Sequence, residues 1–359
     1  MKVTRVIALV ILSMLLSFVS KRSVQAVRQG SSKRMFSWRG GSAGFGAGST
    51  GRSSSTIASA AATAAALSTN YEDLTVLSQY TIAVAYQPKD REESNLFKKK
   101  HNQPLPALES PTGEDNAFVA VHQDGSVAVG VADGVGGWAD AGYDSSAISR
   151  ELCATIKHQF SHDSQAQPKQ LLETSFQAIL ESPKVEIGGT TACLGVISNR
   201  KLKVANLGDS WCGVFRNYQL VNETAFQTHK FNTPYQLAKI PAHILRQAEL
   251  EGRRYIRDTP AQADVYEWDL QKDDVVLFAT DGVTDNVVPK DIEIFLRDQL
   301  EDKKSDLGDV AKLFVKEVVK VSKDSNFPSA FAQELSTLTG QKYLGGKEDD
   351  ITVVMVRIN

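Results

Sequence analysis

The chain has 359 residues, a length that allows two small domains or one large domain with additional segments. Its 40 Lys and Arg nearly balance its 42 Asp and Glu, which excludes a generic binder of nucleic acid or another polyanion. The charges are unevenly distributed, because residues 1–71 hold nine basic residues and no acid, whereas residues 72–359 hold 31 basic and 42 acidic residues. The sequence therefore predicts a basic leader, residues 1–70, followed by an acidic globular domain, residues 71–359.

The leader begins with a short apolar segment, Val6–Val19. It is shorter than the roughly 20 residues that a membrane-spanning helix needs, but it fits the apolar part of a secretory signal. The rest of the leader is basic, rich in Ser and free of acid, as mitochondrial presequences are, and Arg34–Ser37 resembles a matrix-protease cleavage site. We therefore expect a mitochondrial protein of the matrix or inner membrane, with Val6–Val19 as a candidate for membrane association. Anchoring in another intracellular membrane and secretion are the alternatives. Gly40–Ala66 is of low complexity and predicts a disordered linker.

Apolar runs in the domain predict mainly strands, with helices between them. The expected strands are Thr81–Tyr86, Ala117–Val121, Val127–Val131, Thr190–Ile197, Leu202–Asn206, Val275–Ala279 and Ile351–Val356. The expected helices are Ser145–Phe160, Lys169–Leu180, Pro289–Leu300 and Leu307–Val321. Because helices do not alternate singly with strands, the order favours an α+β fold of antiparallel sheets with helices outside.

Three further features complete the expected organisation. His122–Ser126 joins two strands as a hairpin, and Phe226–Gln262 is a long insertion expected on the surface. The three cysteines cannot all pair and have no metal-type spacing, so we expect buried thiols rather than disulfides or a zinc ribbon.

Acidic residues lie next to apolar runs at five places in the domain. They are Glu114 and Asp115 in GEDN, Asp133 in VADGVGGW, Asp209 in LGDS, Asp281 in ATDG, and Asp349 and Asp350 in EDD. Acids at strand ends can converge if the strands share a sheet, but several converging carboxylates repel one another unless a cation compensates them. Ligand sets of oxygen alone suit Mg²⁺ or Mn²⁺, and two such ions about 4 Å apart would activate a bridging water and clamp a phosphoryl oxygen. Asp-Gly is also an ordinary turn dipeptide, so composition and spacing leave a metal site and structural turns both open.

The ordered set GED, VADGVGGW, GGTTA, LGDS, FATDGVTDN and EDDIT, from about Ser78 to the C-terminus, resembles the metal-dependent protein phosphatases, or type 2C serine/threonine phosphatases. NTPYQL at Asn232–Leu237, and DGVGGW in place of the family's usual DGHGG, resemble the mitochondrial branch found in fungi and animals. That branch is linked to mitochondrial metabolism and ubiquinone biosynthesis. The resemblance implies a four-layer α-β-β-α sandwich of two antiparallel sheets flanked by helices.

The resemblance also implies roles for the acids. Asp133 would bridge two Mg²⁺ or Mn²⁺ ions and, with Asp281, act in catalysis. The resemblance assigns Glu114 and the Gly134 carbonyl to one ion, Asp281 and Asp349 to the other, Asp115 to a water or a supporting role, Asp209 to a third and weaker ion, and Asp350 to a supporting role.

Two positions depart from the family pattern. Val135 stands where the family often has a general-acid His, and Ser110 stands where it often has a phosphate-binding Arg. Phosphate would then be held by the metals, or by a basic residue such as Arg91 or Lys98–Lys100, although the run Lys98–Lys100 is more typical of a solvated loop. A metal-bound water would protonate the leaving group. The six histidines show no ligand pattern.

We expect, from this resemblance, a phosphatase that hydrolyses phosphoserine and phosphothreonine in mitochondrial phosphoproteins, with no nucleic acid as partner. Two alternatives stay open. One is a pseudophosphatase that binds phosphoproteins without cleaving them, and the other is a phosphatase of a small phosphorylated metabolite.

Overall fold

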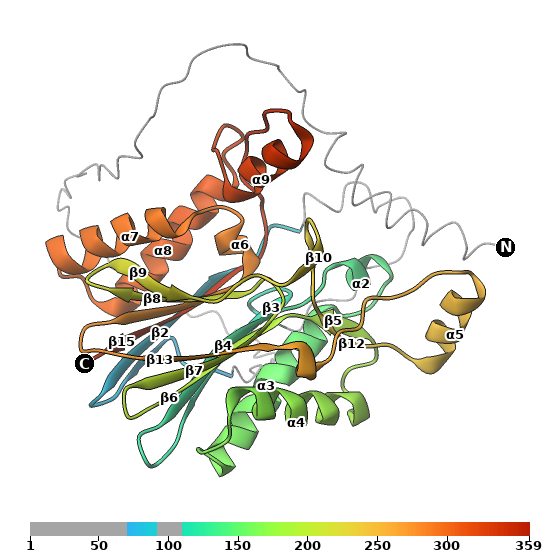
Figure 1. Cartoon of the computed structure of the whole chain (residues 1–359), viewed down its shortest axis with the longest axis horizontal. Coiled ribbons are helices and arrows are strands. Elements are labelled where there is room, and N and C mark those ends of the chain that lie inside the picture. Colours follow the sequence, from blue (N-terminus) through green and yellow to red (C-terminus); the bar gives the residue numbers. More distant parts are fainter. Residues whose placement is uncertain (1–69, 92–109) are drawn as a thin grey trace, which may run out of the picture.

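The computed structural model describes residues 70–91 and 110–359, in which two antiparallel sheets pack face to face (Figure 1). The larger sheet contains, in spatial order, β1 (Leu74–Val76), β2 (Tyr80–Gln87), β15 (Ile351–Ile358), β14 (Val275–Ala279), β8 (Trp211–Arg216) and β9 (Gln219–Glu223). The smaller sheet contains β13 (Asp264–Asp269), β7 (Lys201–Leu207), β6 (Ala192–Ser198), β4 (Val127–Asp133) and β3 (Asp115–Val121).

Apolar side chains of both sheets fill the space between them. Val84, Phe278 and Val354 of the larger sheet join Val129 and Cys193 of the smaller one in a single buried cluster. The central strands are buried on both faces, which explains their continuous apolar sequences.

Helices cover the outer face of each sheet. On the smaller sheet lie α3 (Ser146–His162) and α4 (Pro168–Glu181). On the larger sheet lie α6 (Asp281–Thr284), α7 (Pro289–Leu296), the π-helical turn η4 (Arg297–Asp302) and α8 (Leu307–Ser322), with α9 (Ala330–Thr339) beyond them. The expected α+β architecture, a four-layer α-β-β-α sandwich, is confirmed (Figure 1).

Shorter elements surround one end of the sandwich. They are α2 (Gly137–Asp140), β5 (Gly188–Thr190), β10 (Thr228–Lys230), β11 (Thr233–Pro234), β12 (Leu237–Lys239), α5 (Ala242–Leu250) and η3 (Pro260–Gln262). Two expectations need correction here. The single strand expected at 190–197 is two strands, because β5 leaves the sheet to pair with β12. The insertion expected on the surface, 226–262, is partly core, since Leu237 packs beneath α3 and α4.

The hairpin at His122–Ser126 and the unpaired, buried cysteines agree with expectation. The leader up to residue 69, with Val6–Val19 and Gly40–Ala66, and the basic run Lys98–Lys100 lie outside the described residues. Among the described helices, none has the length and apolar character that crossing a bilayer requires.

Candidate metal centre

The ends of four strands bring acids of both sheets to one edge of the sandwich. Asp115 begins β3 and Asp133 ends β4, and the two residues are partners in the antiparallel register. Asp281 directly follows Thr280 at the end of β14, while Asp349 lies just before β15. The Thr280 hydroxyl donates to Asp115 Oδ2 at 2.7 Å, so a hydrogen bond connects the two sheets at this edge.

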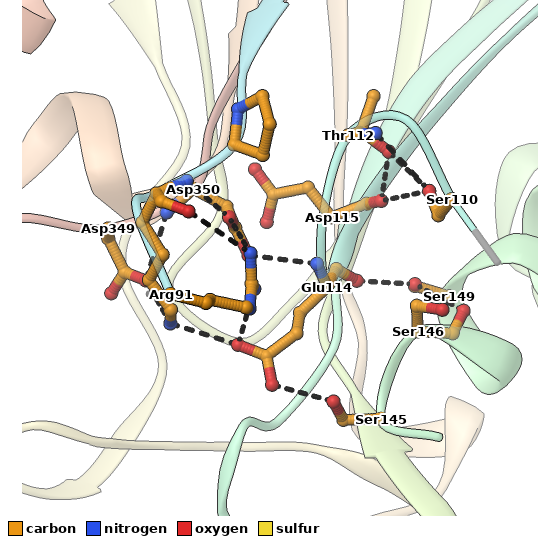
Figure 2. A network of polar contacts seen from close by, with 12 residues as sticks. Arg91, Ser110, Thr112, Glu114, Asp115, Ser145, Ser146, Ser149, Asp349 and Asp350 are labelled. Atoms are coloured by element: carbon orange, nitrogen blue, oxygen red, sulfur yellow. Dashed lines mark hydrogen bonds and ion pairs between the residues drawn. The ribbon is translucent and has the colours of Figure 1, made fainter. Parts of the chain in front are cut away.

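Glu114 is held by groups from two other parts of the chain (Figure 2). Ser145 Oγ, at the start of α3, donates to Glu114 Oε1 at 2.6 Å. Lys89 Nζ and Arg91 Nη2 lie 2.9 Å and 3.0 Å from Glu114 Oε2. Burial alone would raise the pKa of Glu114, but the Lys89 ammonium and the Ser145 hydroxyl outweigh it and lower that pKa.

The Asp350 carboxylate organises this side of the centre. Its oxygens accept from the backbone N–H groups of Glu114 and Lys89, both at 2.8 Å, and from Arg91 Nη2 at 2.5 Å (Figure 2). Gly113 makes room for it: the residue has φ +78°, and a Cβ there would lie 2.5 Å from Asp350 Cγ. Asp350 therefore positions the segment that carries Glu114 and is fully engaged in doing so.

On the opposite side, the ammonium of Lys347 lies among acids. Lys347 Nζ is 2.7 Å from Asp281 Oδ2 and 3.5 Å from Asp349 Oδ2, and it also pairs with Asp285. Burial raises the pKa of Asp285 to about 7 even though Lys347 lowers it. For Asp349, burial is outweighed by Lys89 and Lys347, so its pKa lies below the ordinary range.

Sequence reasoning missed Lys89, Asp285 and Lys347. Signals for two of them were present. Asp285 follows Asp281 by four residues, one helical turn, and Lys347 stands two residues before Asp349. For Lys89 we find no signal in the sequence.

Asp133 faces other carboxylates, and no Lys or Arg of the described residues pairs with it. Burial, followed by the charges of Asp281 and Asp115, raises the pKa of Asp133 well above its ordinary value. Asp209 lies in the turn between β7 and β8, and burial, followed by the charges of Asp281 and Asp285, raises its pKa. All the acids expected from the sequence therefore lie at or beside this edge.

The donor groups present fit a hard divalent cation. Asp115 Oδ1 and Asp281 Oδ1 are buried oxygens with no hydrogen-bond partner. Gly136 leaves space beside the Glu114 carboxylate, because a Cβ at Gly136 would lie 2.9 Å from both carboxylate oxygens. Within 70–91 and 110–359, no three His, Cys, Asp or Glu side chains already form a metal-binding group, and ammonium and guanidinium groups lie between the acids. Oxygen-only donors, among them the uncompensated carboxylates of Asp115 and Asp133, are nevertheless what Mg²⁺ and Mn²⁺ prefer.

Neither of the two positions that depart from the family pattern supplies the group that it replaces. Ser110 bonds to the Thr112 hydroxyl at 2.7 Å and brings no positive charge to the centre. Val135 likewise offers no proton donor in its side chain. The guanidinium of Arg91, by contrast, reaches Glu114 from the segment that follows β2, so a basic group does lie at this edge.

Comparisons with known proteins identify the family of the chain. Residues 123–359 match the family model described as Stage II sporulation protein E (SpoIIE). "Protein phosphatase 2C homolog 7, mitochondrial" of Saccharomyces cerevisiae is 50% identical over 288 residues, covering 78% of this chain and 82% of that protein. The human "Protein phosphatase PTC7 homolog" is 35% identical over 247 residues, covering 68% of this chain and 78% of that protein.

A solved structure, that of the photosystem II phosphatase PBCP, is similar to this fold with a TM-score of 0.60 and 25% sequence identity. The match covers 78% of this chain and 99% of that chain. The family expected from the sequence motifs is thereby confirmed. The chain belongs to the type 2C family of protein phosphatases and is a protein serine/threonine phosphatase.

Proposed function

We propose that the protein is a mitochondrial, Mg²⁺- or Mn²⁺-dependent enzyme that hydrolyses phosphoserine and phosphothreonine in proteins. The proposal rests on the carboxylates that separate strand ends bring together at one edge of the sandwich. Among them, Asp133 has no cationic partner within the described residues. The mitochondrial location, in the matrix or inner membrane, is supported by the name of the yeast relative and by the basic, acid-free leader. Support of ubiquinone biosynthesis is proposed from the resemblance to the mitochondrial branch alone.

The proposed assignment keeps the roles that the family resemblance implies. In this assignment Asp133 would contact both ions. One ion would also be held by Glu114 and the Gly134 carbonyl, and the other by Asp281 and Asp349. Asp115 would hold a water, and Asp209 would hold a third ion. When bound, hard divalent cations supply activation of water and neutralisation of phosphoryl charge.

The protein's own residues hold this set in place. Ser145 and Asp350 fix the carboxylate and the backbone of Glu114, and Thr280 fixes one oxygen of Asp115 while leaving the other without a partner. We propose that Arg91 contacts phosphate oxygens in place of the Arg that Ser110 replaces. Its side chain is 28% exposed, which leaves its guanidinium within reach of a substrate.

The test compares substrates for the full chain in Mn²⁺. We expect turnover of a phosphothreonine peptide, unaffected by a large excess of a phosphorylated small metabolite, and an increase in KM for Arg91→Met. Binding of the peptide without turnover would favour the pseudophosphatase. Preferential turnover of the metabolite would favour the metabolite phosphatase.

A further inference from the structure

One buried lysine lies in the proposed metal centre and has no role in the assignment of ligands given above. The ammonium of Lys347 is 2.7 Å from Asp281 Oδ2 and 3.5 Å from Asp349 Oδ2. These are the two acids proposed to hold one of the ions. A third carboxylate, that of Asp285, also pairs with the ammonium and has no proposed role toward metal.

The surroundings of Lys347 keep its side chain in this place. The residue is only 8% exposed. Asn286 binds its backbone on both sides, accepting from Lys347 N at 2.9 Å and donating to Lys347 O at 2.8 Å. The ring of Phe331 lies beneath the ammonium, with its centroid 5.5 Å from Nζ. The side chain therefore has little contact with solvent, and Asp285 offers its ammonium a partner other than Asp281 and Asp349.

Lys89 provides an informative contrast. It also bridges proposed ligands, at 2.9 Å from Glu114 Oε2 and 2.8 Å from Asp349 Oδ1. Its side chain is 29% exposed, however, against 9% for that of Lys347. Lys89 can turn toward water when a cation takes its carboxylates, whereas Lys347 stays beside them.

We propose that Lys347 is a built-in counter-ion that competes with the divalent cation for Asp281 and Asp349. It is a positioning residue, which compensates the acids in the metal-free protein and weakens metal binding at this half of the centre. The inference rests on the proposed metal centre. Its chemical basis is simple: a fixed positive charge a few ångströms from a bound cation repels it, and the same charge attracts the carboxylates that the cation needs.

Removing the ammonium should therefore have two opposite effects. Without metal, three neighbouring carboxylates lose their common cation, which destabilises the folded protein. With metal, Asp281 and Asp349 have no competitor, so the ion binds more tightly. A residue with a purely structural role would produce the first effect without the second.

The experiment is calorimetric titration of the full chain with Mn²⁺, together with thermal unfolding in EDTA. We expect Lys347→Met to bind Mn²⁺ at least about tenfold more tightly than wild type, while its unfolding temperature in EDTA falls by about 5 °C or more. The matched control is Lys290→Met, which removes another lysine–carboxylate pair, with Glu293 at 2.6 Å, on an exposed surface of α7. It should leave Mn²⁺ affinity unchanged.

A second comparison guards against poor folding of the single variant. Asp285→Asn leaves the Lys347 ammonium with only the two proposed ligands as carboxylate partners. The double variant Lys347→Met/Asp285→Asn removes the ammonium and leaves fewer uncompensated acids than Lys347→Met alone. We expect the double variant to bind Mn²⁺ at least about tenfold more tightly than Asp285→Asn. Equal or weaker binding would overturn the inference. Failure of wild type itself to bind Mn²⁺ would instead overturn the proposed metal centre.

Discussion

Asp115 and Asp133 are directly opposite each other in the antiparallel register of β3 and β4. Like charges at such a pair destabilise a sheet. Burial and neighbouring carboxylates raise the pKa of both acids, and neither has a lysine or arginine partner in the described part of the chain. This pair of acids is therefore electrostatically unfavourable until a cation binds.

Asp133→Asn should abolish phosphatase activity without unfolding the protein. The substitution removes the proposed bridging carboxylate, so we expect hydrolysis of a phosphothreonine peptide to fall by about 10³-fold or more. It also relieves repulsion among the acids, so the unfolding temperature in EDTA should stay the same or rise. Asp269→Asn, on exposed β13, is the control and should keep full activity. Normal turnover by Asp133→Asn would remove this residue from the mechanism.

Mn²⁺ should stabilise the wild-type protein against heat. An ion that binds only the folded state raises the free energy of unfolding by about 2.7 kcal/mol at a concentration 100 times its Kd. For a domain of this size, that increase raises the unfolding temperature by several degrees. Scanning calorimetry with Mn²⁺ or EDTA measures the difference. In Asp281→Asn the shift should largely disappear, and an undiminished shift there would place the ion elsewhere.

Stability of the metal-free protein should fall as the pH rises through neutrality. Asp285 has a pKa of about 7 in the folded protein against 3.8 for the free side chain, so the folded state binds more protons than the unfolded state between these values. The stability that this group contributes is present below about pH 4 and is lost as the pH rises through about 7. Thermal unfolding in EDTA at pH 5.5 and 7.5 measures the trend, which should weaken in Asp285→Asn.

With Mn²⁺ present the trend with pH should reverse, because metal binding requires deprotonated carboxylates. A protein whose stability in EDTA rises steadily from pH 5.5 to 7.5 would contradict the arrangement of acids described here.

Gly113→Ala should disturb the centre through Asp350. The residue has φ +78°, and the added Cβ would lie 2.5 Å from Asp350 Cγ. Gly125→Ala is a matched control with φ +85° and no heavy atom within 4 Å of its Cβ, so it measures backbone strain alone. We expect about 1 kcal/mol of destabilisation for Gly125→Ala and about 1–3 kcal/mol more for Gly113→Ala. Only Gly113→Ala should also lose phosphatase activity. Urea unfolding measures the stability of both variants, and hydrolysis of a phosphothreonine peptide measures their activity. Equal effects of the two variants would show that the contact with Asp350 is unimportant.

Much of the fold could be predicted from the sequence, because strands buried on both faces are continuously apolar. Val275–Ala279 is such a strand and was predicted to the residue. Two of the edge strands were missed for the same reason: β9 and β13 alternate between exposed and less exposed residues and together carry several charges. The break at Thr191 could not be foreseen either, since it depends on Thr191 N–H donating to Asp133 O, a contact between distant segments.

The proposed metal ligands could be named from the sequence because each stands beside a strand in a recognisable motif, although Asp285 was missed. Their counter-ions could not. Lys89 lies 25 residues before Glu114, so only the paired sheets bring its ammonium to that carboxylate. Lys347 gave a weak signal by its place before Asp349, but its burial among three acids follows from Asn286 and Phe331, which belong to other elements.

The most direct test of the proposed centre is hydrolysis of a phosphothreonine peptide by the full chain after EDTA treatment, before and after Mn²⁺ is added back, with Asp281→Asn beside the wild type. We predict no turnover in EDTA, recovery on addition of Mn²⁺ for the wild type, and no recovery for Asp281→Asn. Turnover that persists in EDTA, or that Mn²⁺ restores equally in Asp281→Asn, would contradict the account.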